Sequence, residues 1–459
     1  MKCKIVEMNL GKITWAFAFL LISIVSLSQN EMKEFHNWAS APPMGWNSYD
    51  CFGAAVNEAE VKGNAKMMEV HLKDAGWEYV VIDYCWYYPY VGALNNPPQT
   101  DDFSPSFSMD KYGRLLPAVD RFPSASKGKG FKEIGDYIHS LGLKFGIHIM
   151  RGIPREAVAK KLPIKGTGYT ADQITDYTSC AWLNNMYGLD MDKPGAQEYY
   201  NSLFELYAKW GVDYVKVDDI ASPFREKEIT GYRKAIDNCG RPMVLSLSPG
   251  EAPLGEAEFL KNHANLWRIS GDFWDDWEAL EKQFERTHKW EKYIGAGHWP
   301  DADMIPFGML SRRGPEVDIE HRSRFTDNEK YTLMTLWSIC RSPLMYGGDL
   351  MLMRPIELNL LTNKEVLKVN QNSTNNHQIF RKENQVAWLA AIPNSNDKYL
   401  ALFNLGEEVE KIEVNLNEVG FTNKTKVRDL WQHKELGEFE GSISPEVEPH
   451  GSVLFRISN

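Results

Sequence analysis

The sequence contains little cysteine, and its cysteines are spaced too widely for a metal site. Six of the 459 residues are cysteine, and no two of them form a CxxC pair or lie beside histidines at ligand spacing. Structural zinc sites need such clusters of thiolate and imidazole ligands. We therefore predict no metal ion and no other cofactor.

Positive charge is also in short supply. Lysine and arginine number 51 against 62 aspartates and glutamates, which gives a formal net charge of −11 at pH 7. Proteins that bind nucleic acid or anionic membrane surfaces usually carry an excess of basic residues, so neither is an expected partner. No predicted strand is followed by a GxGxxG turn, which argues against a nucleotide-dependent dehydrogenase.

The sequence has one long apolar run, Ile13–Leu27, which follows Lys2, Lys4 and Lys12 and ends in small residues. The run is short for a helix that spans a membrane. Residues 1–28 are therefore predicted to be a secretory signal, with an uncleaved anchor as the alternative. We expect an exported chain, secreted or (in a bacterium) periplasmic, without stable membrane insertion after processing.

If the chain is exported, its cysteines can form a disulfide, because oxidising compartments allow disulfides to form. Cys51 and Cys85 are the candidate pair, since both follow strand ends that the fold predicted below places side by side. An odd number of cysteines remains after residue 28, so at least one thiol is expected to stay free.

The stretch Trp210–Ile220 shows the unit from which most of the chain is built. Gly211 can end a helix, Tyr214–Val217 has the pattern of a buried strand, and the strand stops on charge at Asp218. A short apolar run bounded by breakers is typical of a strand covered on both faces, as in a parallel sheet. Lys216 and Asp218 point to the same side of such a strand. Because a buried cation is costly when unpaired, a partner or ligand is expected there.

The order of helix, glycine, apolar strand and polar end recurs along the chain. The other strand-like runs are residues 41–49, 79–83, 145–149, 243–248, 266–270, 293–297 and 343–348. Eight strands alternating with helices predict an α/β fold, a (β/α)8 TIM barrel, over residues 37–361. Short strands separated by turn residues predict a C-terminal antiparallel β-sandwich over residues 362–459.

Polar side chains follow most of the predicted barrel strands, and the carboxyl ends of barrel strands meet at one mouth. These side chains are Tyr49, Asp83, His148, Lys216, Asp218, Ser248, Arg268 and Asp272, with Asp301 and Asp303 after the seventh strand. One carboxylate at a strand end is more often a turn former. Several carboxylates that converge on one mouth repel one another, and this cost in energy suggests that function requires them there. His148 is most simply a hydrogen-bonded histidine of the barrel.

Two carboxylates that face each other across a pocket, with lysine and arginine nearby, suit glycoside hydrolysis. Asp218 is the candidate nucleophile, because neighbouring Lys216 favours its ionised form. Asp272 is the candidate acid, because Phe273 and Trp274 follow it and an aromatic wall raises the pKa of a carboxyl.

Six motifs occur in the order seen in one known family. They are residues 43–49 (PMGWNSY), 82–83 (ID), 142–147 (GLKFGI), 214–218 (YVKVD), 267–272 (WRISGD) and 299–304 (WPDADM). Together they resemble glycoside hydrolase family 27, the family of α-galactosidases and α-N-acetylgalactosaminidases. The resemblance extends from Pro42 through the C-terminal β domain.

The resemblance implies a retaining, exo-acting glycosidase that releases terminal α-galactosyl residues by double displacement, with a galactose-containing oligo- or polysaccharide as substrate. It implies that Asp218 is the nucleophile and Asp272 the acid/base. The implied substrate contacts are Asp83 and Lys216 on sugar hydroxyls, Arg268 near the 2-position, Trp46 and Tyr49 under the ring, and Asp303 from the last motif.

Two positions depart from the family pattern. α-Galactosidases of the family commonly have two adjacent acids after the second strand, whereas Tyr84 follows Asp83 here. Many members have glutamate where this chain has Ser248. Ser248 either leaves room for an acetamido group, as in the family's N-acetylgalactosaminidases, or is a plain turn residue before Pro249.

The terminal sugar is therefore open among galactose, N-acetylgalactosamine and β-L-arabinopyranose, a galactose-like sugar that lacks C6. A carbohydrate-binding barrel without catalysis is the alternative from another functional class. The oligomeric state is left open.

Overall fold

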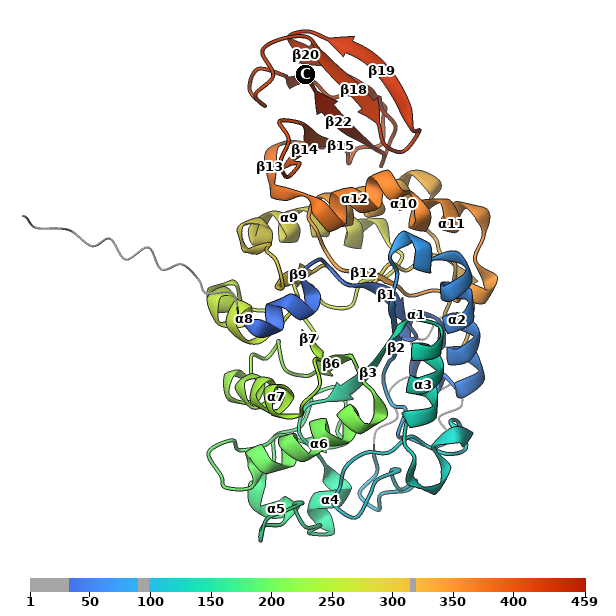
Figure 1. Cartoon of the computed structure of the whole chain (residues 1–459), viewed down its shortest axis with the longest axis vertical. Helices are drawn as coiled ribbons and strands as arrows, with labels where there is room; N and C mark the ends of the chain where they lie inside the picture. Colours follow the sequence, from blue (N-terminus) through green and yellow to red (C-terminus); the bar gives the residue numbers. More distant parts are fainter. Residues whose placement is uncertain (1–32, 90–98, 314–318) are drawn as a thin grey trace, which may run out of the picture. The chain divides into compact units, whose positions relative to one another are not determined.

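Eight parallel strands form one curled sheet in the order β12-β1-β2-β3-β6-β7-β8-β9 (Figure 1). The computed structural model describes residues 33–89, 99–313 and 319–459, and the predicted signal lies outside them. The strands are β1 (Met44–Asn47), β2 (Tyr79–Ile82), β3 (Lys144–Met150), β6 (Tyr214–Asp218), β7 (Val244–Leu247), β8 (Leu266–Arg268), β9 (Trp299–Asp301) and β12 (Leu344–Tyr346). Ile305, four residues past the edge strand β9, forms a parallel bridge with Tyr346 of the other edge strand, β12. The predicted TIM-barrel fold is confirmed.

Helices alternate with these strands and lie outside the sheet (Figure 1). The longer ones are α2 (Glu58–His71), α3 (Lys132–Ser140), α6 (Ala196–Trp210), α7 (Glu226–Asn238), α8 (Ala257–His263), α9 (Trp277–Trp290), α10 (Asp327–Ile339), α11 (Pro355–Thr362) and α12 (Lys364–Asn372). Local sequence sets their ends: Asn57 and Glu60 form a capping box at the start of α2. Gly211 ends α6 with a left-handed φ of 81°, so the chain can turn sharply into β6.

The seventh strand is not where the sequence pattern placed it. Residues 291–293 form a 3-10 helix and Gly295 pairs with His298 in a turn, so the predicted strand at 293–297 is wrong. The strand is β9, which pairs with β8 through Trp299 and Pro300. Its three residues include a proline, which lacks the N–H of a typical strand residue and hides the strand from pattern reading.

Two long segments follow β2 and β3 at the C-terminal side of the barrel. The second contains α4 (Arg155–Ala159), α5 (Ala171–Ile174) and the small sheet of β4 (Ile153–Pro154) and β5 (Met186–Tyr187). Farther along the chain, β10 (Met309–Leu310) pairs with β11 (His321–Arg322).

The C-terminal part has an antiparallel six-stranded sheet in the order β13-β14-β15-β22-β18-β19 and two further strand pairs. Its strands are β13 (Thr374–Lys382), β14 (Gln385–Ala391), β15 (Lys398–Asn404), β16 (Glu410–Lys411), β17 (Val414–Asn415), β18 (Thr425–Asp429), β19 (Lys434–Phe439), β20 (Ser442–Ile443), β21 (Glu446–Val447) and β22 (Ser452–Ser458). One face carries its own apolar core, which includes Leu400, Phe421 and Val427. The predicted antiparallel C-terminal domain is confirmed, and α12 precedes its first strand.

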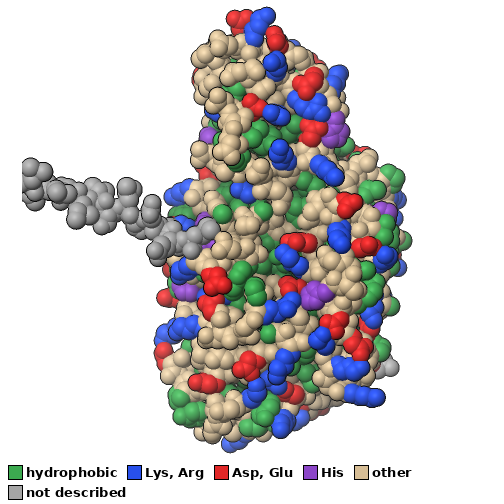
Figure 2. Space-filling model, in the orientation of Figure 1, with side chains coloured by type: hydrophobic (Ala, Val, Ile, Leu, Met, Phe, Trp, Pro, Cys, Tyr) green, Lys and Arg blue, Asp and Glu red, His purple; other side chains and the backbone are tan. Residues whose placement is uncertain are grey.

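This domain contacts the barrel through α10. The Thr332 hydroxyl donates to the carbonyl of His450 at 2.7 Å, and the Trp431 indole donates to the Thr335 hydroxyl at 2.9 Å. Among the described residues, we find no helix that could span a bilayer. Figure 2 shows basic and acidic side chains interspersed over the visible face of the molecule.

Candidate active site

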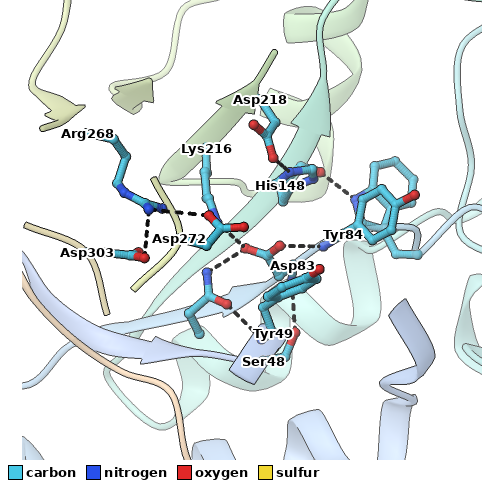
Figure 3. Close-up of polar contacts among 12 residues, drawn as sticks. Ser48, Tyr49, Asp83, Tyr84, His148, Lys216, Asp218, Arg268, Asp272 and Asp303 are labelled. Atoms are coloured by element: carbon cyan, nitrogen blue, oxygen red, sulfur yellow. Dashed lines mark hydrogen bonds and ion pairs between the residues drawn. The ribbon is translucent and has the colours of Figure 1, made fainter. Parts of the chain in front are cut away.

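A pocket of about 360 Å³ opens where the barrel strands end, at the face where barrel enzymes place their chemistry. Its walls come from the ends of strands distant in sequence. The residues that line it are Tyr49, Asp83, Tyr84, Trp182, Lys216, Asp218, Pro249, Gly250, Gly271 and Asp272. Both candidate catalytic carboxylates, Asp218 and Asp272, therefore face one cavity (Figure 3).

Asp218 ends β6, and its carboxylate is held on both oxygens. Oδ2 accepts a hydrogen bond from His148 Nε2 at 3.0 Å (Figure 3). Oδ1 accepts one from the backbone N–H of Asp219 at 2.9 Å. Burial alone would raise the pKa of Asp218, but the His148 hydrogen bond and the charge of Lys216 outweigh it and lower that pKa. The carboxylate is thus ionised and oriented, as a nucleophile must be.

His148 lies in β3, beside β6, and its side chain is 1 % exposed. Because Asp218 can only accept, Nε2 carries the hydrogen, and Nδ1 has no partner among the described residues. The rings of Tyr84 and His148 are nearly perpendicular, with centroids 5.7 Å apart. The sequence indicated a hydrogen-bonded histidine of the barrel but did not identify its partner. The strand register explains the contact, because His148 of β3 lies opposite Lys216 of β6, two residues before Asp218.

Asp83 and Lys216 form a second charged group in the pocket. Asp83 Oδ2 accepts from Asn47 Nδ2 at 2.6 Å and from Lys216 Nζ at 3.1 Å, and Oδ1 accepts from the backbone of Tyr84 at 2.8 Å (Figure 3). Burial opposes both charges, but each residue stabilises the other: the pKa of Asp83 is lowered and that of Lys216 raised. The buried cation expected from the sequence of β6 has its partner.

Asp272 lies beyond β8 and is held much more loosely. Its side chain is 57 % exposed, and Oδ1 lies 3.3 Å from Arg268 Nη2. Phe273, one of the two residues expected to form an aromatic wall beside it, does not do so, because its ring packs in the core against Phe325 and Trp337. Asp272 is therefore a carboxylate at the mouth of the pocket, open to water.

Arg268 and Asp303 form a buried pair behind Asp272. Arg268 Nη2 lies 2.7 Å from Asp303 Oδ2, which also accepts from the backbone of Phe273 at 2.8 Å. Burial, only partly offset by Arg268, raises the pKa of Asp303 to about 6. The pair fixes the guanidinium next to Asp272.

The remaining predicted contacts lie just outside the pocket lining. Trp46 is fully buried and its indole donates to the carbonyl of Gly348 at 2.8 Å. Ser248, Arg268 and Asp303 are also buried, and none of the four is among the lining residues of the described chain. Pro249 and Gly250, not Ser248, form the wall after β7.

Trp182, Pro249, Gly250 and Gly271 line the pocket although the sequence did not single them out. The glycines and the proline carried no chemical signal. For Trp182 the available signal was its place in the long segment after β3, since long loops on this side of a barrel shape the pocket.

The disulfide predicted between Cys51 and Cys85 is not formed, and all five cysteines of the described residues have free thiols. The short helix α1 (Tyr49–Phe52) turns the Cys51 thiol back toward the carbonyl of Ser48. Cys85 lies among Tyr84, Tyr87 and Arg121 instead. Strand ends that are neighbours therefore do not bring these two side chains together.

The part of the chain that the structure describes contains no group of three or more histidine, cysteine or acidic side chains placed to hold a metal ion. The residues around the pocket are suited to bind hydroxyls and to transfer protons.

Comparison with known proteins agrees with this geometry. Residues 185–372 match the family model described as alpha galactosidase A, and residues 383–457 match the alpha galactosidase C-terminal beta sandwich domain. The chain is 27 % identical over 464 residues to alpha-galactosidase 2 of Arabidopsis thaliana, covering 99 % of this chain and 98 % of the relative.

Two solved structures are more similar. A GH27 β-L-arabinopyranosidase from Geobacillus stearothermophilus is 49 % identical with a TM-score of 0.90, covering 93 % of this chain and 98 % of that one. A Bacillus halodurans C-125 protein, provisionally described as an α-N-acetylgalactosaminidase, is 48 % identical with a TM-score of 0.82, covering 91 % and 97 % of the two chains.

Proposed function

The chain belongs to glycoside hydrolase family 27 and is a glycosidase, and from this premise we propose that it is a retaining exo-enzyme that releases terminal β-L-arabinopyranosyl residues. The observation that carries the proposal is that Tyr84, not a second acid, lines the pocket beside Asp83. Terminal α-D-galactosyl residues are the second candidate substrate.

In the first step, the Asp218 carboxylate attacks the anomeric carbon while the Asp272 carboxylic acid gives its proton to the leaving oxygen. The bond from carbon to the leaving oxygen breaks, and a covalent glycosyl-Asp218 ester forms. Asp218 suits this role because the hydrogen bonds from His148 and Asp219 fix both of its oxygens. Holding the reacting atoms in place removes much of the entropic barrier.

In the second step, the Asp272 carboxylate takes a proton from water, and the resulting nucleophile displaces Asp218 from the anomeric carbon. Two inversions at this carbon retain its configuration. Asp272 must therefore meet both the leaving group and water, which its exposed position at the pocket mouth allows.

Asp83 and Lys216 are the groups proposed to hold the ring hydroxyls of the terminal sugar. Asp83 can accept from a hydroxyl, and Lys216 can donate to one. Their ion pair at 3.1 Å keeps both charged before substrate arrives, so neither has to change its protonation on binding.

Tyr84 is the residue proposed to select the sugar. In α-galactosidases of the family the matching position is commonly a second acid, which the galactose end carrying C6 would meet. β-L-Arabinopyranose has the ring configuration of α-D-galactopyranose without C6, so it loses least when an aromatic ring replaces that acid. The 49 % identity to a GH27 β-L-arabinopyranosidase also supports this choice.

The specific observation in favour of galactose is the match of both family models to α-galactosidase domains. An N-acetylgalactosamine substrate is supported by the provisionally described relative from Bacillus halodurans. It would have to fit its acetamido group against Pro249 and Gly250, which form that wall of the pocket.

The test is a panel of nitrophenyl β-L-arabinopyranoside, α-D-galactopyranoside and α-N-acetylgalactosaminide. We expect kcat/KM to be about tenfold or more higher for the arabinopyranoside than for the galactoside, the scale on which one added group is discriminated. NMR of the first product should show retained anomeric configuration. A higher value on either other sugar would replace the proposed substrate, and an inverted product would contradict the role of Asp218.

We further propose that residues 1–28 direct export of the enzyme, so that it meets oligosaccharides outside the cytosol. N-terminal sequencing of the mature protein from its native host tests this: an N-terminus near residue 29 is expected, and an intact Met1 in the cytosolic fraction would contradict it.

A further inference from the structure

Trp182 stands at the mouth of the catalytic pocket with much of its indole in water. It lines the pocket together with Asp272, and its exposed fraction is 44 %. Nine other tryptophans are fully buried or nearly so, which is where such a large apolar side chain gains most from leaving water. An exposed tryptophan beside a binding pocket is therefore a candidate for contact with a ligand.

The backbone around Trp182 is firmly anchored. Cys180 and Leu183 on either side of it are buried, at 5 % and 1 % exposure. Arg155 donates to the carbonyl of Asn184 at 2.9 Å, and the Asn184 side chain accepts from the backbone of Gln99 at 3.0 Å. The indole is thus presented on a fixed support, so little order has to be gained when a ligand packs on it.

The inner edge of Trp182 meets Tyr84. The two rings contact edge to face, with centroids 6.4 Å apart and planes at 62°. Tyr84 is 2 % exposed, so the pair runs from the interior of the pocket to its mouth. The inner ring is placed for the terminal sugar, and the outer ring for whatever is attached to it.

Asp272 shows on which side that attached group lies. It is the proposed acid, so the leaving oxygen must come within hydrogen-bond distance of its carboxylate, which is itself at the mouth and 57 % exposed. The leaving group then departs past the exposed side chains of Asp272 and Trp182, which both line the pocket.

We propose that Trp182 is a specificity-determining platform for the leaving group, and that its indole packs against the apolar C–H face of a sugar, or an aryl ring, linked to the terminal residue. The natural substrate is accordingly a glycoside whose leaving group is itself a ring. This inference rests on the proposed glycosidase function and on the role of Asp272 as acid.

The experiment compares the wild-type enzyme with Trp182→Ala, using the sugar that the wild type hydrolyses best. Nitrophenyl glycoside has a ring as leaving group, methyl glycoside has none, and the free monosaccharide fills only the inner part of the pocket. For Trp182→Ala we expect KM for the nitrophenyl glycoside to rise about tenfold, as for the loss of one stacking contact, while kcat changes little. The inhibition constants of methyl glycoside and free monosaccharide should change less than about twofold.

Two matched variants complete the test. Trp182→Phe keeps an aromatic face and should restore most of the affinity. Tyr177→Ala removes an aromatic side chain of the same segment that is 57 % exposed but does not line the pocket, and it should leave all constants unchanged.

Three results would overturn the proposal. An equal rise in the inhibition constant of the free monosaccharide would assign Trp182 to the terminal sugar. The same loss in Tyr177→Ala would indicate a general effect on the segment, and an unchanged KM would leave Trp182 without a role. If the wild-type enzyme hydrolyses none of the three nitrophenyl glycosides of the panel, the proposed function itself fails, which is a different outcome.

Discussion

The two carboxylates of the pocket are chemically identical but are held in opposite ways. Asp218 ends a barrel strand, is 14 % exposed and receives hydrogen bonds on both oxygens. Asp272 lies in the segment after a strand, is 57 % exposed, and has a contact with Arg268 at 3.3 Å. The difference matches the two tasks, because a nucleophile needs a fixed direction whereas an acid/base group must exchange protons with water and with the leaving group.

The part of the site that holds Asp218, here called the rigid side, includes further buried contacts behind this residue. The backbone N–H of Arg151 donates to the Asp218 carbonyl at 3.0 Å, and the Arg151 guanidinium lies 2.8 Å from both Asp219 and Glu228. All three of these side chains are buried. On the open side, Arg268 binds Asp303 more closely, at 2.7 Å, than it binds Asp272. The protein therefore fixes the charge near Asp272 and leaves the carboxylate itself free to turn.

The largest effect that this comparison predicts is for Asp218→Asn. The amide cannot form the ester intermediate, so kcat should fall by at least about 10⁴-fold on every substrate, activated or not. The substitution keeps the shape of the side chain, so circular dichroism should report an unchanged fold. Folded protein with substantial turnover would show that Asp218 is not the nucleophile and would remove the contrast between the two acids.

Asp272→Ala should give a smaller loss that depends on the leaving group. General acid catalysis contributes about 10²–10⁴-fold, but a nitrophenolate departs without a proton. The first step on nitrophenyl glycosides should therefore be slowed far less than the first step on disaccharides, as measured by pre-steady-state release of each leaving group. Equal losses on both would contradict the role of Asp272 as acid.

The strand that carries Asp218 could be predicted from the sequence, whereas the surroundings of Asp272 could not. The strand Tyr214–Val217 and the same-face placement of Lys216 and Asp218 follow from period-two alternation, so β6 and its charged end were predicted correctly. The surroundings of Asp272 were not: Phe273 follows it in sequence, but its ring packs in the core away from solvent. Neighbours along a loop do not determine neighbours in space, and Trp182 was overlooked for the same reason.

His148 tests the rigid side without removing the nucleophile. His148→Phe keeps a ring for Tyr84 to pack on but deletes the donor to Asp218, and a hydrogen bond to a charged group is worth about 1.5–3 kcal/mol. We expect kcat to fall about 10- to 100-fold with KM little changed, because Asp218 then loses its orientation.

His148→Gln is the matched control, since its amide can still donate to Asp218 and should recover a large part of the rate. A loss in His148→Gln as great as in His148→Phe would indicate that the imidazole acts through packing. No loss in either variant would show that Asp218 does not depend on this hydrogen bond.

The smallest effect is expected for Tyr84, the residue proposed to select the sugar. Its substitution should change substrate preference and leave the roles of Asp218 and Asp272 unchanged. Tyr84→Asp places a second carboxylate beside Asp83, as α-galactosidases of the family commonly have, and removes the ring that contacts His148. The ratio of kcat/KM on the α-galactoside to that on the β-L-arabinopyranoside should rise about tenfold, the size of one polar contact to the substrate.

Tyr84→Phe changes only the hydroxyl, keeps the contacts of the ring with His148 and Trp182, and should leave the ratio within about twofold of the wild type. A ratio that stays constant in Tyr84→Asp would show that the sugar is selected elsewhere. If Tyr84→Asp also changed how the rate of the first step depends on the leaving group, sugar recognition and acid catalysis by Asp272 would be coupled. The two carboxylates would then not act as independently as their different surroundings suggest.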